Sequence, residues 1–198
     1  MKPTIAITAG DINGVGYEVL IKSLANSHIT EICRPVVYGN SKVARQHLQK
    51  VDEEYRNIQW NIIQDPKQAK DGRLNLISCY SDDTPLQLGT STPEAGQAAF
   101  KSLQRACQDL KKGLVDALVT APINKDNIQS DDFRFAGHTE YLTEQFGEGK
   151  DSLMMMISEQ MRVALVCNHT PIAKVAETIT VERILNKLTV LDQPLKTD

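Results

Sequence analysis

The sequence has few of the features that mark nucleic-acid-binding, secreted or membrane proteins. The net charge is −3, and no run of Lys or Arg is longer than the pair Lys111-Lys112, so the charge pattern does not favour nucleic acid or an anionic membrane as a partner. No segment approaches the roughly 18 apolar residues of a membrane span. The N-terminal apolar run, of about four residues, is also too short for a signal peptide. We therefore expect a cytoplasmic protein.

Cysteine is scarce and scattered. The sequence has four cysteines and no C-x-x-C pair, a pattern that does not favour a zinc cluster or a redox motif. In a cytosolic chain we expect all four to be ordinary core or strand thiols. They are Cys33, Cys79, Cys107 and Cys167.

The rest of the composition is that of a globular protein, with 198 residues, 41% hydrophobic and 24% charged, which is enough for one or two domains. Apolar runs alternate with segments of helical periodicity, which predicts an α/β fold with a mostly parallel sheet. The expected strands are 4–8, 35–38, 60–63, 74–77 and 116–120. The expected helices are 15–24 with Val15, Val19, Leu20 and Leu24 on one face, 41–48 capped by Ser41, 93–112 capped by Thr92, and 181–191 capped by Thr180.

The pattern changes after Thr120. Apolar runs at 152–157 and 163–166 predict a hairpin, so the second half is expected to be partly antiparallel. We therefore predict a first α/β domain over 1–120 and a second over 121–198. A parallel sheet of this kind usually continues beyond a final helix, so both domains are expected to be incomplete and the chain to be cut.

Two polar segments follow predicted strands of the first half. The segment 10–16 is rich in glycine and carries Asp11 at the carboxyl end of the first strand, where α/β sheets bind ligands. It is either a tight turn without a ligand or a loop that lines a site. The segment 120–125 ends in Lys125, which can hold a phosphate or carboxylate or can simply be a solvated lysine. Asn124 in the same segment can be a helix cap.

Two further segments carry histidine. In 137–141, Thr139 can cap a helix, and His138 and Thr139 would then present donors at its N-terminus, which favours an anion. The alternative is a cap beside an exposed histidine. In 167–171, His169 can offer a ring nitrogen to a metal, although a catalytic metal commonly needs three protein ligands. His28 and His47 are expected at the surface, and Met154, Met155 and Met156 in the core.

Taken in order along the chain, the segments 8–18, 120–125, 137–140 and 168–171 resemble the 4-hydroxythreonine-4-phosphate dehydrogenases of pyridoxal-phosphate biosynthesis. The resemblance implies a fold like that of isocitrate and isopropylmalate dehydrogenases, with two α/β domains and a homodimer whose site lies at the subunit interface. The opening departs from the commoner Gly-Asp-Pro-Ala-Gly-Ile-Gly-Pro-Glu pattern, because Ile12, Asn13 and Tyr17 replace Pro, Ala and Pro.

The resemblance also implies roles for individual residues. His138 and Thr139 should contact the substrate, and His169 should be one of three histidine ligands to a divalent metal (Zn, Mg or Co). Our own hypothesis adds that Lys125 and Asp11 are catalytic residues that shape the site. The other two metal-binding motifs, Asn-Pro-His-Ala-Gly and Tyr-His-Asp-Gln-Gly, do not occur in this sequence. The residues that bind the NAD or NADP cofactor are not assigned.

The implied reaction is the NAD-dependent, metal-assisted oxidation and decarboxylation of 4-phosphooxy-L-threonine to 3-amino-2-oxopropyl phosphate. The resemblance covers this whole chain but only the first part of the family's length, so the isolated chain is expected to be inactive. Three alternatives stay open. They are oxidation of a related phosphorylated hydroxy acid, a phosphate acyltransferase-like activity, and a non-catalytic fragment that binds a phosphorylated ligand.

Overall fold

A computed structural model describes residues 2–195 of the chain, with side chains described as far as Asp192. The chain forms two compact units, which divide between Ala136 and Gly137. Residues 196–198, which fall in the predicted second domain, lie outside the described residues.

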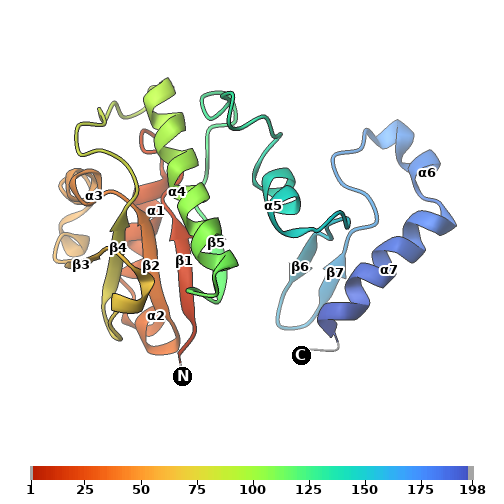
Figure 1. Cartoon of the computed structure of the whole chain (residues 1–198), viewed down its shortest axis with the longest axis horizontal. Coiled ribbons are helices and arrows are strands. Elements are labelled where there is room, and N and C mark those ends of the chain that lie inside the picture. The colour runs from red at the N-terminus through yellow and green to blue at the C-terminus, as the bar shows by residue number, and fades with distance from the viewer. Residues whose placement is uncertain (1, 196–198) are drawn as a thin grey trace. The chain divides into compact units, whose positions relative to one another are not determined.

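The first unit is built on a five-stranded parallel sheet (Figure 1). All five predicted strands form, with ends within one residue of the prediction, and their order in the sheet is β3-β4-β2-β1-β5. Thr8 of β1 is in register with Tyr38 of β2 and Thr120 of β5, so these three strands end at the same edge. The strands are β1 (Thr4–Thr8), β2 (Arg34–Gly39), β3 (Trp60–Ile63), β4 (Leu74–Ser78) and β5 (Ala117–Thr120).

Helices cover both faces of this sheet because successive strand residues point to opposite sides. Val36 and Tyr38 pack in one cluster with Ala106 of α4, whereas Val37 between them packs in another with residues of α1 and α3. This double burial explains why the strands are continuous apolar runs. The helices of the unit are α1 (Gly16–Leu24), α2 (Ser27–Ile32), α3 (Ser41–Leu48) and α4 (Pro93–Lys111), with 3-10 turns η1 (Glu53–Tyr55) and η2 (Pro66–Gln68).

Two details of these helices differ from the prediction. The residue that caps α3 is Asn40 rather than Ser41, because the Asn40 side chain accepts hydrogen bonds from the backbone N–H groups of the first turn. In α1 the predicted buried face is wrong in part. Val15 and Val19 are exposed, whereas Tyr17 and Ile21 are buried beside Leu20 and Leu24. The cap of α4 is Thr92, as predicted, with its hydroxyl accepting from Ala95 N.

The second unit contains the predicted hairpin. Strands β6 (Met155–Ile157) and β7 (Arg162–Ala164) pair antiparallel, although both are shorter than the apolar runs that predicted them. The prediction that the methionines form core was wrong for Met154 and Met156, which are exposed. The unit also contains α5 (His138–Phe146), η3 (Ile172–Lys174), α6 (Val175–Thr178) and α7 (Val181–Leu195), the last capped by the Thr180 hydroxyl.

The division between the units lies later in the chain than the predicted crossover at Thr120. Residues 121–136 have no strand or helix of their own, yet Ile128 and Phe133 are fully buried in the first unit. The ring of Phe133 meets that of Phe100 on α4 edge-to-face, with centroids 5.6 Å apart. This packing attaches the segment that carries Lys125 to the parallel sheet.

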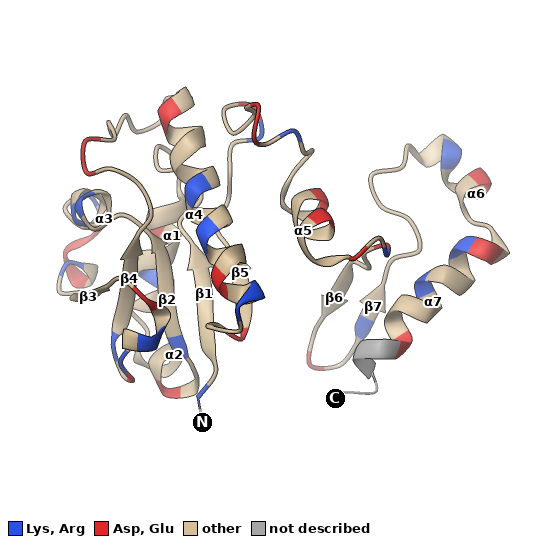
Figure 2. Cartoon of the chain, viewed as in Figure 1, with Lys and Arg blue, Asp and Glu red and all other residues tan. Residues whose placement is uncertain are grey.

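The charge pattern agrees with the sequence analysis. Figure 2 shows both signs of charge on α4 and α7, and the Lys and Arg residues are not gathered on one helix. None of the helices in the described part of the chain combines the length and apolar composition that crossing a bilayer requires.

Candidate functional site

The carboxyl edge of the parallel sheet is where the predicted residues of the first unit meet. The turn after β1 and the segment after β5 lie against each other, and Asp11 N donates a hydrogen bond to Pro122 O over 2.9 Å. Gly10 makes this approach possible. It has a φ of +68°, and a Cβ there would collide with the Pro122 carbonyl. The structure therefore places Asp11 and Lys125 on neighbouring segments of one sheet edge.

Asp11 is almost buried, with 8% of its surface exposed. Its Oδ1 accepts a hydrogen bond from Asn13 N at 3.0 Å, and its carbonyl accepts one from Gly14 N at 3.2 Å. These bonds fix the turn that leads into α1. Asp11 therefore helps to fix the turn at this edge of the sheet, while its role as a catalytic residue that shapes a site stays a prediction.

Lys125 is exposed at the same edge. The residue before it, Asn124, caps the turn that follows, since its Oδ1 accepts from Asp126 N at 2.9 Å and from Asn127 N at 3.3 Å. The Asn124 amide also donates to Ser91 Oγ at 3.2 Å. The backbone beside Lys125 is thus held while its ammonium group faces solvent, an arrangement suited to an anion that approaches from outside.

A buried polar network beside the turn was missed by the sequence analysis. His47, predicted at the surface, is 4% exposed, and its ring stacks on Tyr17 with centroids 4.9 Å apart. His47 Nε2 donates to Ile12 O at 2.9 Å. The Tyr17 hydroxyl accepts from Asn40 N at 2.8 Å and bonds the Tyr80 hydroxyl at 2.9 Å. His28, by contrast, is exposed as predicted.

The burial of His47 leads to a pH prediction. Burial lowers the pKa of His47 below its usual 6.5, because the imidazolium loses hydration, and the bond to the Ile12 carbonyl offsets this only in part. The unfolded chain then binds more protons than the folded one as the pH falls through 6.5, so the free energy of unfolding should decrease there. Urea unfolding of the wild type and His47→Phe between pH 8 and 5 checks this. The variant should show a shallower decrease, and equal slopes would contradict the assignment.

In the second unit, His138 and Thr139 form the first turn of α5. The predicted cap is wrong, because Gly137 occupies the N-cap position and no side chain there accepts a hydrogen bond. The backbone carbonyl of Thr139 accepts a hydrogen bond from the Thr143 hydroxyl at 2.8 Å, one turn further along the helix. Both His138 and Thr139 are half-buried. No side chain caps the helix at Gly137, and a helix N-terminus favours an anion through its dipole.

His169 lies on the exposed segment between β7 and η3 and has a φ of +50°, a left-handed conformation that is uncommon outside glycine. Such an outlier is a reason to suspect a functional constraint at this residue. Over residues 2–192, no group of three or more His, Cys, Asp or Glu could hold a metal ion. These side chains do not by themselves form a metal site, so His169 is a candidate for one ligand only.

The five-stranded parallel sheet covered by helices, followed by a small unit with an antiparallel hairpin, defines the chain as an α/β protein. The model of the family "Pyridoxal phosphate biosynthetic protein PdxA" matches residues 31–198, and the chain belongs to that family.

Individual relatives agree. The chain is 43% identical to a 4-hydroxythreonine-4-phosphate dehydrogenase of Bacteroides thetaiotaomicron, over 100% of this chain and 53% of that protein. It is 32% identical to a Clostridium botulinum protein provisionally named a D-threonate 4-phosphate dehydrogenase, over 93% of this chain and 55% of that protein. The crystal structure of a 4-hydroxythreonine-4-phosphate dehydrogenase from Burkholderia phymatum superposes with a TM-score of 0.82 at 32% identity, over 96% of this chain and 57% of that one. The chain thus spans about half the length of the relatives it matches.

Proposed function

We propose that this chain is part of an enzyme that oxidises 4-phosphooxy-L-threonine to 3-amino-2-oxopropyl phosphate with NAD or NADP as the hydride acceptor. The observation that carries the proposal is the sheet edge that brings Asp11 and Lys125 together, in a chain of the PdxA family. The nicotinamide cofactor would accept a hydride from C3 of the substrate while the C3 hydroxyl loses its proton. The resulting β-keto acid loses CO₂, and a proton replaces the carboxyl group.

The residues of this chain would bind and orient the substrate. Lys125 supplies a positive charge at the sheet edge, and the N-terminus of α5, which carries His138 and Thr139, favours an anion through the helix dipole. Each of these groups suits a phosphate or carboxylate. His169 is proposed as one ligand of a divalent metal. A homodimer and a cytoplasmic location belong to the same proposal and rest on the family resemblance.

The proposal is tested with the full product of the gene, incubated with 4-phosphooxy-L-threonine, NAD or NADP and a divalent metal. We expect reduced nicotinamide to form, which is measured by its characteristic absorbance. One CO₂ should be released for each nicotinamide that is reduced. A phosphate acyltransferase or a ligand-binding protein would produce neither. The absence of nicotinamide reduction with both cofactors would overturn the proposal.

A second substrate has support from one relative, the Clostridium botulinum protein whose name refers to D-threonate 4-phosphate. That compound carries a hydroxyl where 4-phosphooxy-L-threonine carries an amino group. The relative at 43% identity is named for the amino acid substrate, which is why we place that substrate first. The ratio of kcat/KM for the two compounds decides between them.

Lys125 provides a prediction about binding. Replacing it with methionine keeps the length of the side chain but removes the charge, so we expect KM for the phosphorylated substrate to rise about 10-fold, as loss of a charge-assisted hydrogen bond typically does. Lys112→Met is the matched control, because Lys112 is also exposed but lies at the C-terminal end of α4, whereas Asn124 contacts Ser91 beside the N-terminal end. Steady-state kinetics measures both. An equal effect of the two substitutions would contradict a specific role for Lys125.

A further inference from the structure

Asn13 makes more contacts with one distant segment than a turn residue needs. It is 3% exposed, its Nδ2 donates to Thr90 O at 2.9 Å and to Thr92 Oγ1 at 3.2 Å, and its Oδ1 accepts from Gln87 N at 2.8 Å. Its own carbonyl accepts from Gly89 N at 2.8 Å. The donors and acceptor of this side chain are therefore all directed to residues 87–92, which we call the bridging segment.

The bridging segment connects the turn of Asp11 to two other parts of the sheet edge. Ser91 accepts a hydrogen bond from Asn124, the residue before Lys125, and Thr92 caps the N-terminus of α4. A direct bond from Asp11 N to Pro122 O joins the outer two segments. Three chain segments far apart in the sequence thus form a closed ring of hydrogen bonds, in which Asn13 supplies the side chain that spans the first gap.

The alanine of the commoner pattern cannot make these bonds, since it has no side-chain donor or acceptor. With alanine at position 13, Gln87 N and Thr90 O would need other partners or water, because unpaired buried polar groups are costly. Of the bonds described above, the bridging segment would keep the one from Gly89 N to the carbonyl of residue 13 and the one from the Asn124 amide to Ser91. Greater mobility of the bridging segment would include Ser91, and it would weaken the hydrogen bond that Ser91 accepts from Asn124.

We propose that Asn13 is a positioning residue, which fixes the bridging segment and through it the backbone that presents Lys125. The inference rests on the proposed function, since it assigns Lys125 to the binding of the substrate phosphate. Asn13 itself need not touch the substrate. Its effect should therefore appear in substrate binding more than in the chemical step.

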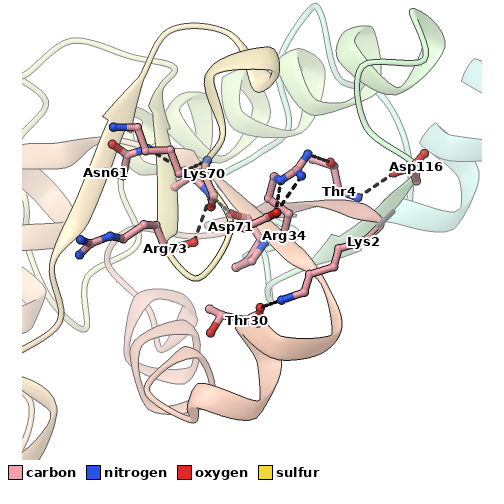
Figure 3. Close-up of polar contacts among 11 residues, drawn as sticks. Lys2, Thr4, Thr30, Arg34, Asn61, Lys70, Asp71, Arg73 and Asp116 are labelled. Atoms are coloured by element: carbon pink, nitrogen blue, oxygen red, sulfur yellow. Dashed lines mark hydrogen bonds and ion pairs between the residues drawn. The ribbon is translucent and has the colours of Figure 1, made fainter.

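The test compares Asn13→Ala with a matched control, Asn75→Ala, in the full product of the gene. Asn75 is also fully buried, and its Nδ2 donates to the carbonyls of Pro35, Lys70 and Arg73 at 3.0, 3.2 and 3.1 Å. It lies at the opposite edge of the sheet, where the strands begin. Figure 3 shows Lys70 and Arg73 there beside Arg34 and Asp71. Both substitutions remove a buried side-chain amide, but only the amide of Asn13 is hydrogen-bonded to the bridging segment.

For Asn13→Ala we expect faster amide hydrogen exchange at Gln87, Gly89 and Asp126, the last because its N–H donates to Asn124 Oδ1. We also expect a KM about 10-fold higher with kcat within about twofold of the wild type, as when binding shared by ground state and transition state is lost. Asn13→Asp keeps the acceptor for Gln87 N but loses both Nδ2 donors, so its exchange at Gln87 and its KM should lie between those of the wild type and Asn13→Ala. Asn75→Ala should lower the melting temperature and leave KM and these three amides unchanged.

Unchanged exchange at Asp126 in Asn13→Ala, or an equal rise in KM in Asn75→Ala, would overturn the positioning role. If the wild-type protein does not oxidise the substrate, the proposed function fails instead. The exchange of the Asp126 amide then decides the positioning proposal alone, because it needs no substrate.

Discussion

Gly10→Ala is expected to lower the free energy of unfolding of the first unit by about 3 kcal/mol or more, a loss typical of a backbone collision in a packed region. A Cβ at this position would approach the Pro122 carbonyl more closely than the 3.0 Å that real Cβ contacts keep. Neither partner can move away easily. Gly10 leads into the Asp11 turn, and Pro122 accepts the hydrogen bond from Asp11 N.

The control is Gly72→Ala, which separates the collision from the backbone conformation. Gly72 has a φ of +66°, close to the +68° of Gly10, but a Cβ there would meet nothing within 4 Å. Only the left-handed backbone penalty then applies, which is on the order of 1 kcal/mol. Urea unfolding followed by the fluorescence of Trp60, the single tryptophan of the sequence, reports on the first unit. Equal losses in the two variants would show that the contact with Pro122 does not matter.

The collision also connects stability with function. If Gly10→Ala folds, its turn must move away from residues 121–122, which would change the spacing between the segments of Asp11 and Lys125. We therefore expect the Gly10 variant to lose substrate binding at temperatures where it is still folded. The Gly72 variant should lose only stability, because its turn lies before β4, at the edge of the sheet away from these residues.

The central strands β1, β2 and β4 could be predicted from the sequence because each is an apolar run that is buried along most of its length. The edge strands β3 and β5 are apolar runs as well, although Ile62 and Val119 on them are exposed. The helix caps were harder. Asn40 and Ser41 are both good capping residues, and the choice depends on where the chain leaves β2. In α5 the helix begins two residues earlier than a Thr139 cap would require. The position of the first turn is set by tertiary context in both cases.

The polar contacts of the site could be predicted only in part. The motifs located Asp11 and Lys125 because each follows a strand, and parallel strands end at one edge. Asn13 was noted only as a departure from the family pattern, since its partners lie more than 70 residues further along the chain. The prediction for His47 was wrong because it treated the helix context as polar, whereas His47 continues the buried face of Val43 and Ala44 one turn before it. The ring that His47 stacks on belongs to α1. A local sequence pattern cannot predict these contacts, because the two partners are far apart in the sequence and become neighbours only when the chain folds.

His169→Asn is expected to abolish most of the turnover of the enzyme and to remove bound metal while leaving the fold intact. Asparagine is chosen because it tolerates the left-handed conformation at φ +50°, so the backbone of the segment is kept while the imidazole is lost. Loss of one ligand commonly weakens a metal site severely, so we expect kcat/KM to fall by roughly 100-fold or more. Metal content is measured by elemental analysis after dialysis, and the fold by circular dichroism.

The matched control for this prediction is His28→Asn. His28 is also an exposed histidine, but it lies on α2 of the first unit, paired with Glu31. Its replacement should leave both metal content and turnover at the wild-type level. Metal retained in full by the His169 variant would remove His169 from the ligand set. The left-handed backbone would then need another explanation, and His169→Gly would supply the test, because glycine adopts that conformation freely and should raise stability if the outlier serves only the turn.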